Sequence, residues 1–160
     1  MALRIRPAAP SDATVIHGFI RALADYENLL DQVQASEADI AGVLFCAEPR
    51  AFCDIAELDG AAVGFALWFY NLSTFTGRHG VYLEDLYVRP EARGCGAGRA
   101  LLAGLARRCA DEGLTRLEWA VLDWNAPAIR FYDRLGAGTQ SEWVIRRLTG
   151  EALEALARVG

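Results

Sequence analysis

The periods at which hydrophobic and polar residues recur change several times along the chain, and each change predicts an element of secondary structure. Leu3 to Arg6 reads as a short first strand that Pro7 ends. From about Ser11, apolar residues at helical spacing predict a helix whose buried stripe is Ile16, Phe19, Ile20 and Leu23. Ser36 and Asp39 have the spacing of a capping box, which predicts the start of a second helix.

The middle of the chain has the pattern of a hairpin followed by a third strand. Asp59-Gly60 is a strong hairpin signal, and the runs on either side of it, Ala51–Leu58 and Ala61–Leu72, are predicted strands. The second run is apolar on both faces, which places it in the centre of the sheet. A loop over Ser73–Gly80 then leads to a strand over Val81–Val88.

Helices and strands follow one another in the second half of the chain. The predicted elements are a helix over Ala97–Glu112, a strand over Leu117–Leu122, a short helix opened by Asn125-Ala126-Pro127, a last strand over Trp143–Leu148 and a terminal helix over Glu151–Val159. The order is therefore β-αα-βββ-α-β-α-β with a C-terminal helix. This order predicts an α/β fold built on a mixed sheet.

Composition narrows the class of protein. A length of 160 residues suits one domain over residues 1–160. Sixteen basic and twenty-one acidic residues give a net charge of −5, which argues against nucleic acid as a general partner. No apolar run approaches the length of a membrane span and the N-terminus has no apolar signal core, so we expect a cytoplasmic protein without a membrane segment.

Cysteine and histidine residues do not have the spacing of a metal site. The four cysteines form no Cys-x-x-Cys pair and the two histidines lie at no zinc-ligand spacing, so we expect no bound metal. Cys46, Cys53 and Cys109 are interpreted as small core residues in a reducing compartment. Cys95 lies far in sequence from both histidines, and a catalytic cysteine is not expected there.

The stretch that carries the clearest chemistry is Arg93-Gly94-Cys95-Gly96-Ala97-Gly98, between a predicted strand and a predicted helix. Strand, glycine-rich turn and helix together are typical of phosphate binding. Glycines let the backbone approach the ligand, and the N–H groups at a helix start point toward an anion. Arg93 adds a positive charge. The structural alternative is a flexible loop without a ligand.

Three phosphate-binding patterns can be compared with this stretch. A P-loop requires Gly-Lys-Ser/Thr, which does not follow. A dinucleotide-binding loop requires a third glycine where Arg99 stands, and it follows the first strand of an alternating series, whereas three strands joined by reversing connections precede this loop. The pattern Arg-x-x-Gly-x-Gly is met by Arg93, Gly96 and Gly98.

This last pattern resembles the pyrophosphate loop of the GCN5-related N-acetyltransferases, a family that binds acetyl-coenzyme A. The resemblance runs from about Leu3 to Leu148, and further motifs occur in the family's order and spacing: Tyr82 to Val88, Trp124-Asn125, and Phe131-Tyr132 with Leu135-Gly136-Ala137. Three runs are similar to the diamine branch, meaning the spermidine/spermine and thialysine acetyltransferases: Leu83-Glu84-Asp85, Asp25-Tyr26-Glu27 and Val121 to Asn125.

The resemblance implies a role for each matching position on the cofactor side. Backbone N–H groups of the loop hold the pyrophosphate of acetyl-coenzyme A, from Arg93, Gly94, Gly96 and Gly98, with Cys95 and Ala97 in the same loop. The strand segment Leu86-Tyr87-Val88 pairs with the pantetheine arm as an added strand would. Asn125 lies beside that arm, and Tyr132 lies at the thioester sulfur.

On the amine side the resemblance implies that Glu84, Asp85, Tyr26 and Glu27 line the substrate. Glu84 and Tyr132 are the expected catalytic residues, acting as proton acceptor and proton donor. The implied activity is direct acetyl transfer to a primary amine of a small cationic substrate in a ternary complex, by a homodimer to which Trp143 and the terminal helix contribute contacts. The rivals are an acetyltransferase for an aminoglycoside or a protein N-terminus, and a non-catalytic acyl-coenzyme A sensor.

The residues themselves allow structural alternatives to these roles. Glu84 and Asp85 point to opposite faces of a regular strand, so Asp85 could form a structural salt bridge. Asn125 could serve as a helix cap, alone or together with a binding role. Tyr26 and Glu27 could be a solvated helix end, and Tyr132 could be a packed aromatic residue.

Overall fold

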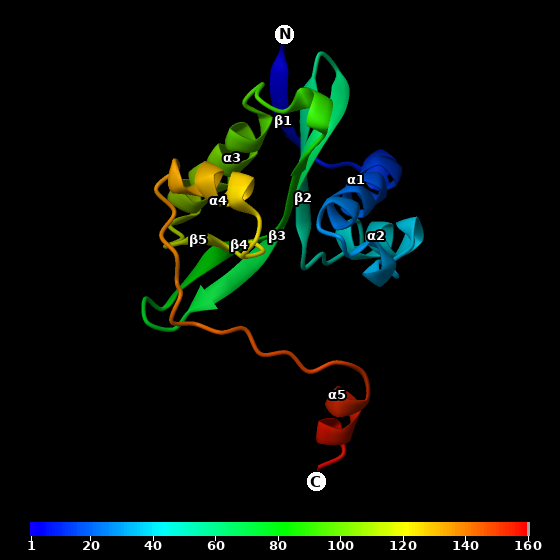
Figure 1. Cartoon of the computed structure of the whole chain (residues 1–160), viewed down its shortest axis with the longest axis vertical. Coiled ribbons are helices and arrows are strands. Elements are labelled where there is room, and N and C mark those ends of the chain that lie inside the picture. Colours follow the sequence, from blue (N-terminus) through cyan, green and yellow to red (C-terminus); the bar gives the residue numbers. More distant parts are fainter. Residues whose placement is uncertain (160) are drawn as a thin grey trace. The chain divides into compact units, whose positions relative to one another are not determined.

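The computed structural model describes residues 1–159, which form two compact units, Met1–Leu122 and the chain from Asp123 onward. The first unit is built on a five-stranded sheet in the order β1-β2-β3-β4-β5 (Figure 1). Neighbouring strands are antiparallel except β4 and β5, which are parallel. The strands are β1 (Leu3–Pro7), β2 (Phe52–Leu58), β3 (Ala61–Ser73), β4 (Arg78–Val88) and β5 (Leu117–Trp119). The predicted mixed sheet is confirmed.

Helices cover both faces of this sheet. They are α1 (Ala13–Tyr26), α2 (Glu37–Leu44) and α3 (Ala97–Glu112), with 3₁₀ turns at Pro10–Asp12, Leu30–Gln32 and Pro90–Ala92. Figure 1 shows α1 and α2 on one face and α3 on the other. On the first face Ile16, Phe19 and Ile55 belong to a buried cluster, and on the second face Leu101 and Leu105 of α3 are buried. Each helix buries its apolar side, as its sequence period predicts.

Local signals in the sequence set several boundaries. The Ser36 side chain accepts a hydrogen bond from the Asp39 N–H and so caps α2. Asp59 and Gly60 have φ angles of 50° and 84°, the left-handed pair that a tight hairpin turn requires. Gly113, with φ of 68°, ends α3 at the predicted residue.

Other boundaries differ from the prediction because a partner strand decides them. Strand β4 begins at Arg78, where Ser73 of β3 pairs with it, so the predicted loop over Ser73–Gly80 shortens. Strand β5 ends at Trp119, before the predicted Leu122. Cys46 is exposed in a turn after α2, so its assignment to the core was wrong, whereas Cys53 and Cys109 are buried.

The second unit contains α4 (Ala126–Asp133) and α5 (Gly150–Ala157). The Asn125 side chain accepts a hydrogen bond from the Ala128 N–H at 3.3 Å, so Asn125 caps α4 as the structural alternative predicts. Gly136 adopts a φ of 79°, and the Ala137 N–H closes the helix end by donating to the Tyr132 carbonyl oxygen.

The predicted strand over Trp143–Leu148 was wrong: this segment has no strand in the described part of the second unit. A strand forms only where a neighbour supplies partners for its backbone groups. Residues 143–145 have exposed fractions of 74%, 76% and 72%. The apolar pattern shows which side chains could pack, but it does not supply a pairing strand.

Residues 1–159 also bear on two general classes of function, membrane insertion and metal binding. Within that range no helix combines the length and the hydropathy needed to cross a bilayer. The same residues contain no group of three or more His, Cys, Asp or Glu side chains arranged to hold a metal ion.

Candidate active site

The glycine-rich loop lies directly at the N-terminus of α3. Gly94 and Gly96 have φ angles of 84° and 90°, a left-handed backbone that favours glycine. No heavy atom lies within 4 Å of the position that a Cβ would take at either residue, so the space beside the loop is open. The sixteen-residue α3 adds the partial positive charge of its N-terminus. These features fit a phosphate group.

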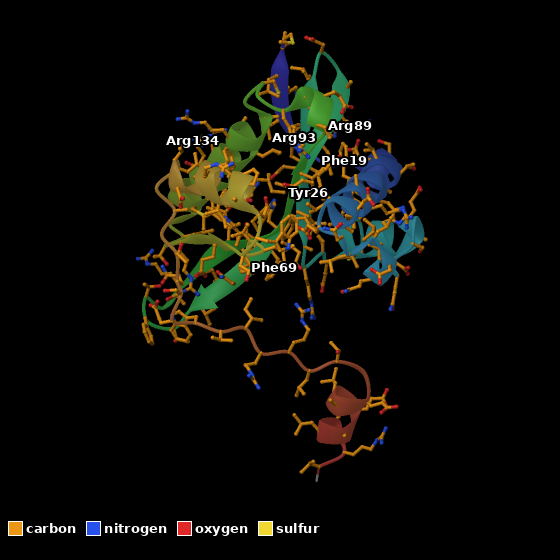
Figure 2. The ribbon with its side chains drawn as sticks, viewed as in Figure 1. Phe19, Tyr26, Phe69, Arg89, Arg93 and Arg134 are labelled. Carbon is orange, nitrogen blue, oxygen red and sulfur yellow. The ribbon has the colours of Figure 1, made fainter. Side chains whose placement is uncertain are left out.

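Arg93 begins this loop and contacts the C-terminal end of α1. Its Nε donates a hydrogen bond to the Val88 carbonyl oxygen at 3.1 Å, and its Cζ lies 5.4 Å from the centre of the Tyr26 ring. Figure 2 shows Arg93 and Tyr26 between the loop and α1. A cation over an aromatic face is an attractive contact. Tyr26, predicted on the amine side, therefore also supports the loop predicted to hold the cofactor.

Strand β4 is irregular at the two carboxylates that the sequence singled out. Opposite β3, Asp85 pairs with Leu67 and Leu83 pairs with Trp68, so Glu84 has no residue opposite it. This register shift is a β-bulge, in which one extra residue is inserted into one strand. Sequence reasoning missed it, because a bulge is defined by the partner strand as well as by its own.

The bulge changes the direction in which Glu84 and Asp85 point. Residues that pair across a sheet share a face. Asp85 shares its face with Leu67, which packs against the α1 core. Tyr82 pairs with Phe69, two residues beyond Leu67, so alternation places Glu84 on this face as well. The prediction that the two carboxylates occupy opposite faces was wrong, because it assumed a regular strand.

The two carboxylates form an acidic cluster with Glu27, which follows the end of α1. Burial raises the pKa of Asp85 to about 6, and the negative charges of Glu84 and Glu27 contribute to the rise. Burial also raises the pKa of Glu27. Glu84 is exposed, whereas Asp85 is half-buried. Carboxylates that repel one another in this way suit a cationic ligand.

Beyond this cluster, β4 no longer pairs with β5. Strands β4 and β5 pair only over Val81–Leu83 and Leu117–Trp119. Within residues 1–159, the segment of β4 from Glu84 to Val88 therefore has β3 as its one strand neighbour. An open edge beside Leu86 and Val88 is the geometry that an extended ligand needs in order to add to a sheet.

The other two predicted site residues belong to the second unit and lie on α4. Asn125 caps the helix, and Tyr132 lies in its last turn, with its ring centroid 5.4 Å from that of Phe131. The Tyr132 carbonyl oxygen accepts hydrogen bonds from the Leu135 and Ala137 N–H groups, which fixes the backbone at this point. Both residues have defined positions within their own unit.

Comparison with known proteins gives a family match over most of the chain. Residues 17–137 match the model of the acetyltransferase (GNAT) family. Thialysine N-epsilon-acetyltransferase from Bos taurus is 40% identical, over 96% of this chain and 96% of that protein. L-ornithine N5-acetyltransferase from Arabidopsis thaliana is 30% identical, over 98% of this chain and 88% of that protein.

Solved structures agree at the level of the fold. An integron cassette protein from the mobile metagenome of V. cholerae has a TM-score of 0.81 and 27% identity, with 99% of each chain covered. An aminoglycoside acetyltransferase from a soil metagenome has a TM-score of 0.76 over 93% of this chain and 97% of that one, but at 16% identity it shows the fold alone. The chain belongs to the acetyltransferase (GNAT) family and is an acetyl-transferring enzyme.

Proposed function

We propose that the protein transfers an acetyl group from acetyl-coenzyme A directly to a primary amine of a small cationic substrate, in a ternary complex. The substrate class is a polyamine, a diamine or a lysine-like amine. The relatives named for thialysine and ornithine acetylation support this class, since both are amino acids with a second amine.

One observation carries the proposal: strand β4 joins the acidic cluster to the glycine loop. The bulged carboxylates lie at Glu84 and Asp85, the open edge follows at Leu86–Val88, and the loop begins at Arg93. A cofactor held along this line would place its thioester end beside the carboxylates and its phosphate end at α3. No other strand of residues 1–159 has both features.

In this proposal the cofactor is held mainly by backbone groups. Acetyl-coenzyme A supplies an activated acyl thioester. The pyrophosphate is bound by N–H groups of the loop Arg93–Gly98, and the pantetheine arm by the edge at Leu86, Tyr87 and Val88. Asn125 lies beside the arm in this proposal, in addition to its capping role. No metal is required, because the thioester is already activated.

The acidic cluster binds the amine and accepts its proton. An alkylammonium has a pKa of about 10.4, so exposing its lone pair at pH 7 costs about 4.6 kcal/mol. We assign proton removal to Glu84 with its coupled neighbour Asp85, directly or through water. Asp85, whose pKa is raised to about 6 by burial and by the nearby acids, is ionised at neutral pH yet basic enough to take a proton. Tyr26 and Glu27 complete the amine side.

Tyr132 donates a proton to the departing thiolate in this proposal. A neutral phenol carries an O–H group that can donate this proton. Its place in the last turn of α4, beside Phe131, supports a fixed ring position. The assignment requires the phenol to meet the thioester sulfur in the complex.

The setting of the enzyme is also part of the proposal. The four cysteines, Cys46, Cys53, Cys95 and Cys109, are all free thiols, which suits a reducing cytoplasm. We propose a homodimer in which the exposed apolar side chains around Trp143 and on α5 are covered by a second copy. Sedimentation at micromolar concentration tests this, and a monomer would contradict it.

Release of coenzyme A in the presence of an amine panel tests the activity. The panel contains diamines, polyamines, lysine-like amino acids, an aminoglycoside, a peptide with a free N-terminus and a neutral arylamine. We expect turnover with the first three classes. Preference for the arylamine, the aminoglycoside or the peptide would contradict the proposed substrate class. Binding of acetyl-coenzyme A without turnover of any amine would instead favour a non-catalytic acyl-coenzyme A sensor.

A further inference from the structure

An open groove of about 560 Å³ lies along α1, outside the acidic cluster and the glycine loop. One wall runs from Ser11, in the 3₁₀ turn before α1, to Ala22 of α1, and the other is formed by Tyr87 of β4 and by Arg89, Pro90 and Glu91 just after that strand. Gly18 has no side chain, and no heavy atom lies within 4 Å of the position that a Cβ would take there, so the groove is open beside it. The groove has room for a small amino acid.

The groove presents one cation and one carboxylate side by side. The Arg89 Cζ lies 5.3 Å from the centre of the Phe19 ring, and Figure 2 shows these two side chains together at α1. This cation–aromatic contact holds the guanidinium at the groove, and the planar fork of N–H donors of an arginine matches a carboxylate. Arg89 Nη1 lies 3.9 Å from Glu91 Oε1, and the two side chains are 45% and 70% exposed. Such a long, exposed pair is weak and leaves both groups available for a ligand.

The groove leads toward the acidic cluster on the same face of the sheet. On α1, Tyr26 lies one turn beyond Ala22, and Glu27 follows it. On β4, Asp85 lies two residues before Tyr87 and shares its face. Four residues of strand, from Asp85 to Arg89, span about 13 Å. Once the reach of the two side chains is included, that span suits an extended lysine-like molecule.

We infer that Arg89 and Glu91 hold the zwitterionic head of an α-amino acid substrate, Arg89 its carboxylate and Glu91 its α-ammonium, while the acidic cluster holds its side-chain amine. This inference rests on the proposed function and narrows its substrate class to amino acids over simple diamines. A polyamine has no carboxylate, so it would not use Arg89.

The other charges near the groove are already engaged. Asp12, at the start of α1, pairs with Arg6 at 2.7 Å. Glu37 accepts a hydrogen bond from the Thr14 hydroxyl at 2.7 Å. Arg89 is therefore the cation that the groove offers within residues 1–159, and Glu91 is the acid beside it.

Matched substrates test the inference directly. L-ornithine and putrescine differ by one carboxylate, as do L-lysine and cadaverine. We expect Arg89→Gln to lower kcat/KM for the amino acids about tenfold, or ~1.4 kcal/mol, mainly through KM. The change for the two diamines should stay within about twofold, or ~0.4 kcal/mol. Wild-type preference for the L over the D amino acid should also fall, because two head-group contacts are needed to discriminate the enantiomers.

Two further variants separate the roles of the two side chains. Glu91→Gln should lower kcat/KM for L-ornithine and leave kcat/KM for its Nα-acetyl derivative unchanged, since that derivative lacks the α-ammonium. Arg21→Gln, a substitution at an exposed position of α1 outside the groove, is the control for net charge. It should not change kcat/KM for the amino acids or for the matching diamines.

The remaining outcomes each overturn the inference. An equal loss for ornithine and putrescine in Arg89→Gln would show that Arg89 does not recognise the carboxylate, and a rise in the Kd of acetyl-coenzyme A alone would place Arg89 on the cofactor. Wild-type turnover of diamines without turnover of amino acids would overturn this inference and leave the proposed function standing. No turnover of any amine would remove both.

Discussion

Asp85 should destabilise the folded protein at the pH at which it works. Burial and the charges of Glu84 and Glu27 raise the pKa of Asp85 from 3.8 to about 6. A group with a raised pKa binds its proton more tightly in the folded state than in the unfolded state. The folded state is therefore penalised increasingly as the pH rises from 3.8 to 6, and the full penalty applies above pH 6, where Asp85 is ionised in both states. Asp85→Asn removes the charge and keeps the shape of the side chain.

The size of the penalty follows from the change in the pKa of Asp85. A rise of about two pH units corresponds to ~3 kcal/mol at 1.36 kcal/mol per unit. Because Asp85 is only half-buried, water screens part of this, and we expect Asp85→Asn to stabilise the fold by about 1–2 kcal/mol at pH 8. For a chain of this length the melting temperature should rise by about 2–8 °C.

Thermal unfolding of both proteins at pH 4 and pH 8 measures the effect. The gain should be present in full at pH 8, shrink as the pH falls below 6, and be small at pH 4, where Asp85 is protonated in the folded state and partly protonated in the unfolded state. Asp111→Asn, an exposed acid on α3, is the matched control and should give no pH-dependent gain. Equal melting temperatures at pH 8, or the same gain at both pH values, would refute the reasoning. The stabilised variant should also lose turnover.

Three further substitutions test the other parts of the site. Gly98→Val, at the start of α3, should raise the Kd of acetyl-coenzyme A about tenfold in calorimetry. Gly42→Val, at an exposed position of α2, is the control. Unchanged affinity in a folded Gly98 variant would contradict the assignment of the phosphate loop. Glu84→Gln should lower turnover about 10²-fold at pH 7 and less at high pH. It should also shift the acidic limb of the profile of turnover against pH to lower pH, because the Glu84 charge raises the pKa of Asp85. Wild-type turnover in Glu84→Gln would show that another group accepts the proton of the amine. Tyr132→Phe should keep the affinity for the cofactor and slow single-turnover acetylation about 10- to 10³-fold. A wild-type rate in this variant would show that Tyr132 packs against its neighbours and is not the proton donor.

The sequence predicted the parts of the fold that depend on local signals. The bounds of α3 agree with the prediction at both ends, since the glycine loop precedes it and Gly113 follows it. The capping box at Ser36 and the hairpin at Asp59-Gly60 also formed as predicted. In each case a few neighbouring residues supply the hydrogen bonds or the backbone conformation, so a single stretch of sequence carries the information.

Features that depend on distant residues could not be predicted in this way. The strand pattern at Trp143–Leu148 has no pairing partner in the described residues, and its apolar alternation could not show that. The contacts of Arg93 with Tyr26 and of Arg89 with Phe19 join α1 to the loop before α3, across more than sixty residues of sequence. Charge and aromaticity were visible in the sequence, but the pairing was not.

The bulge at Glu84 has a second consequence, which separates its backbone role from its side-chain chemistry. Glu84 is the one residue of β4 without a partner opposite it, so the strand segment before it is displaced by one position relative to a regular ladder. If Glu84 were deleted, Leu83 and Asp85 would become neighbours, each could keep its partner on β3, and the pairing would become regular without any residue changing its sheet face. Val81 and Leu83 would stay buried, and Tyr82 would stay on the same face as its partner Phe69. A substitution such as Glu84→Gln leaves the extra residue in place and tests the carboxylate alone, whereas deletion removes the bulge and the carboxylate together. The deletion variant should therefore keep its fold, and the extra residue at position 84 serves to add a second carboxylate on the α1 face, beside Asp85, where the amine must lose a proton.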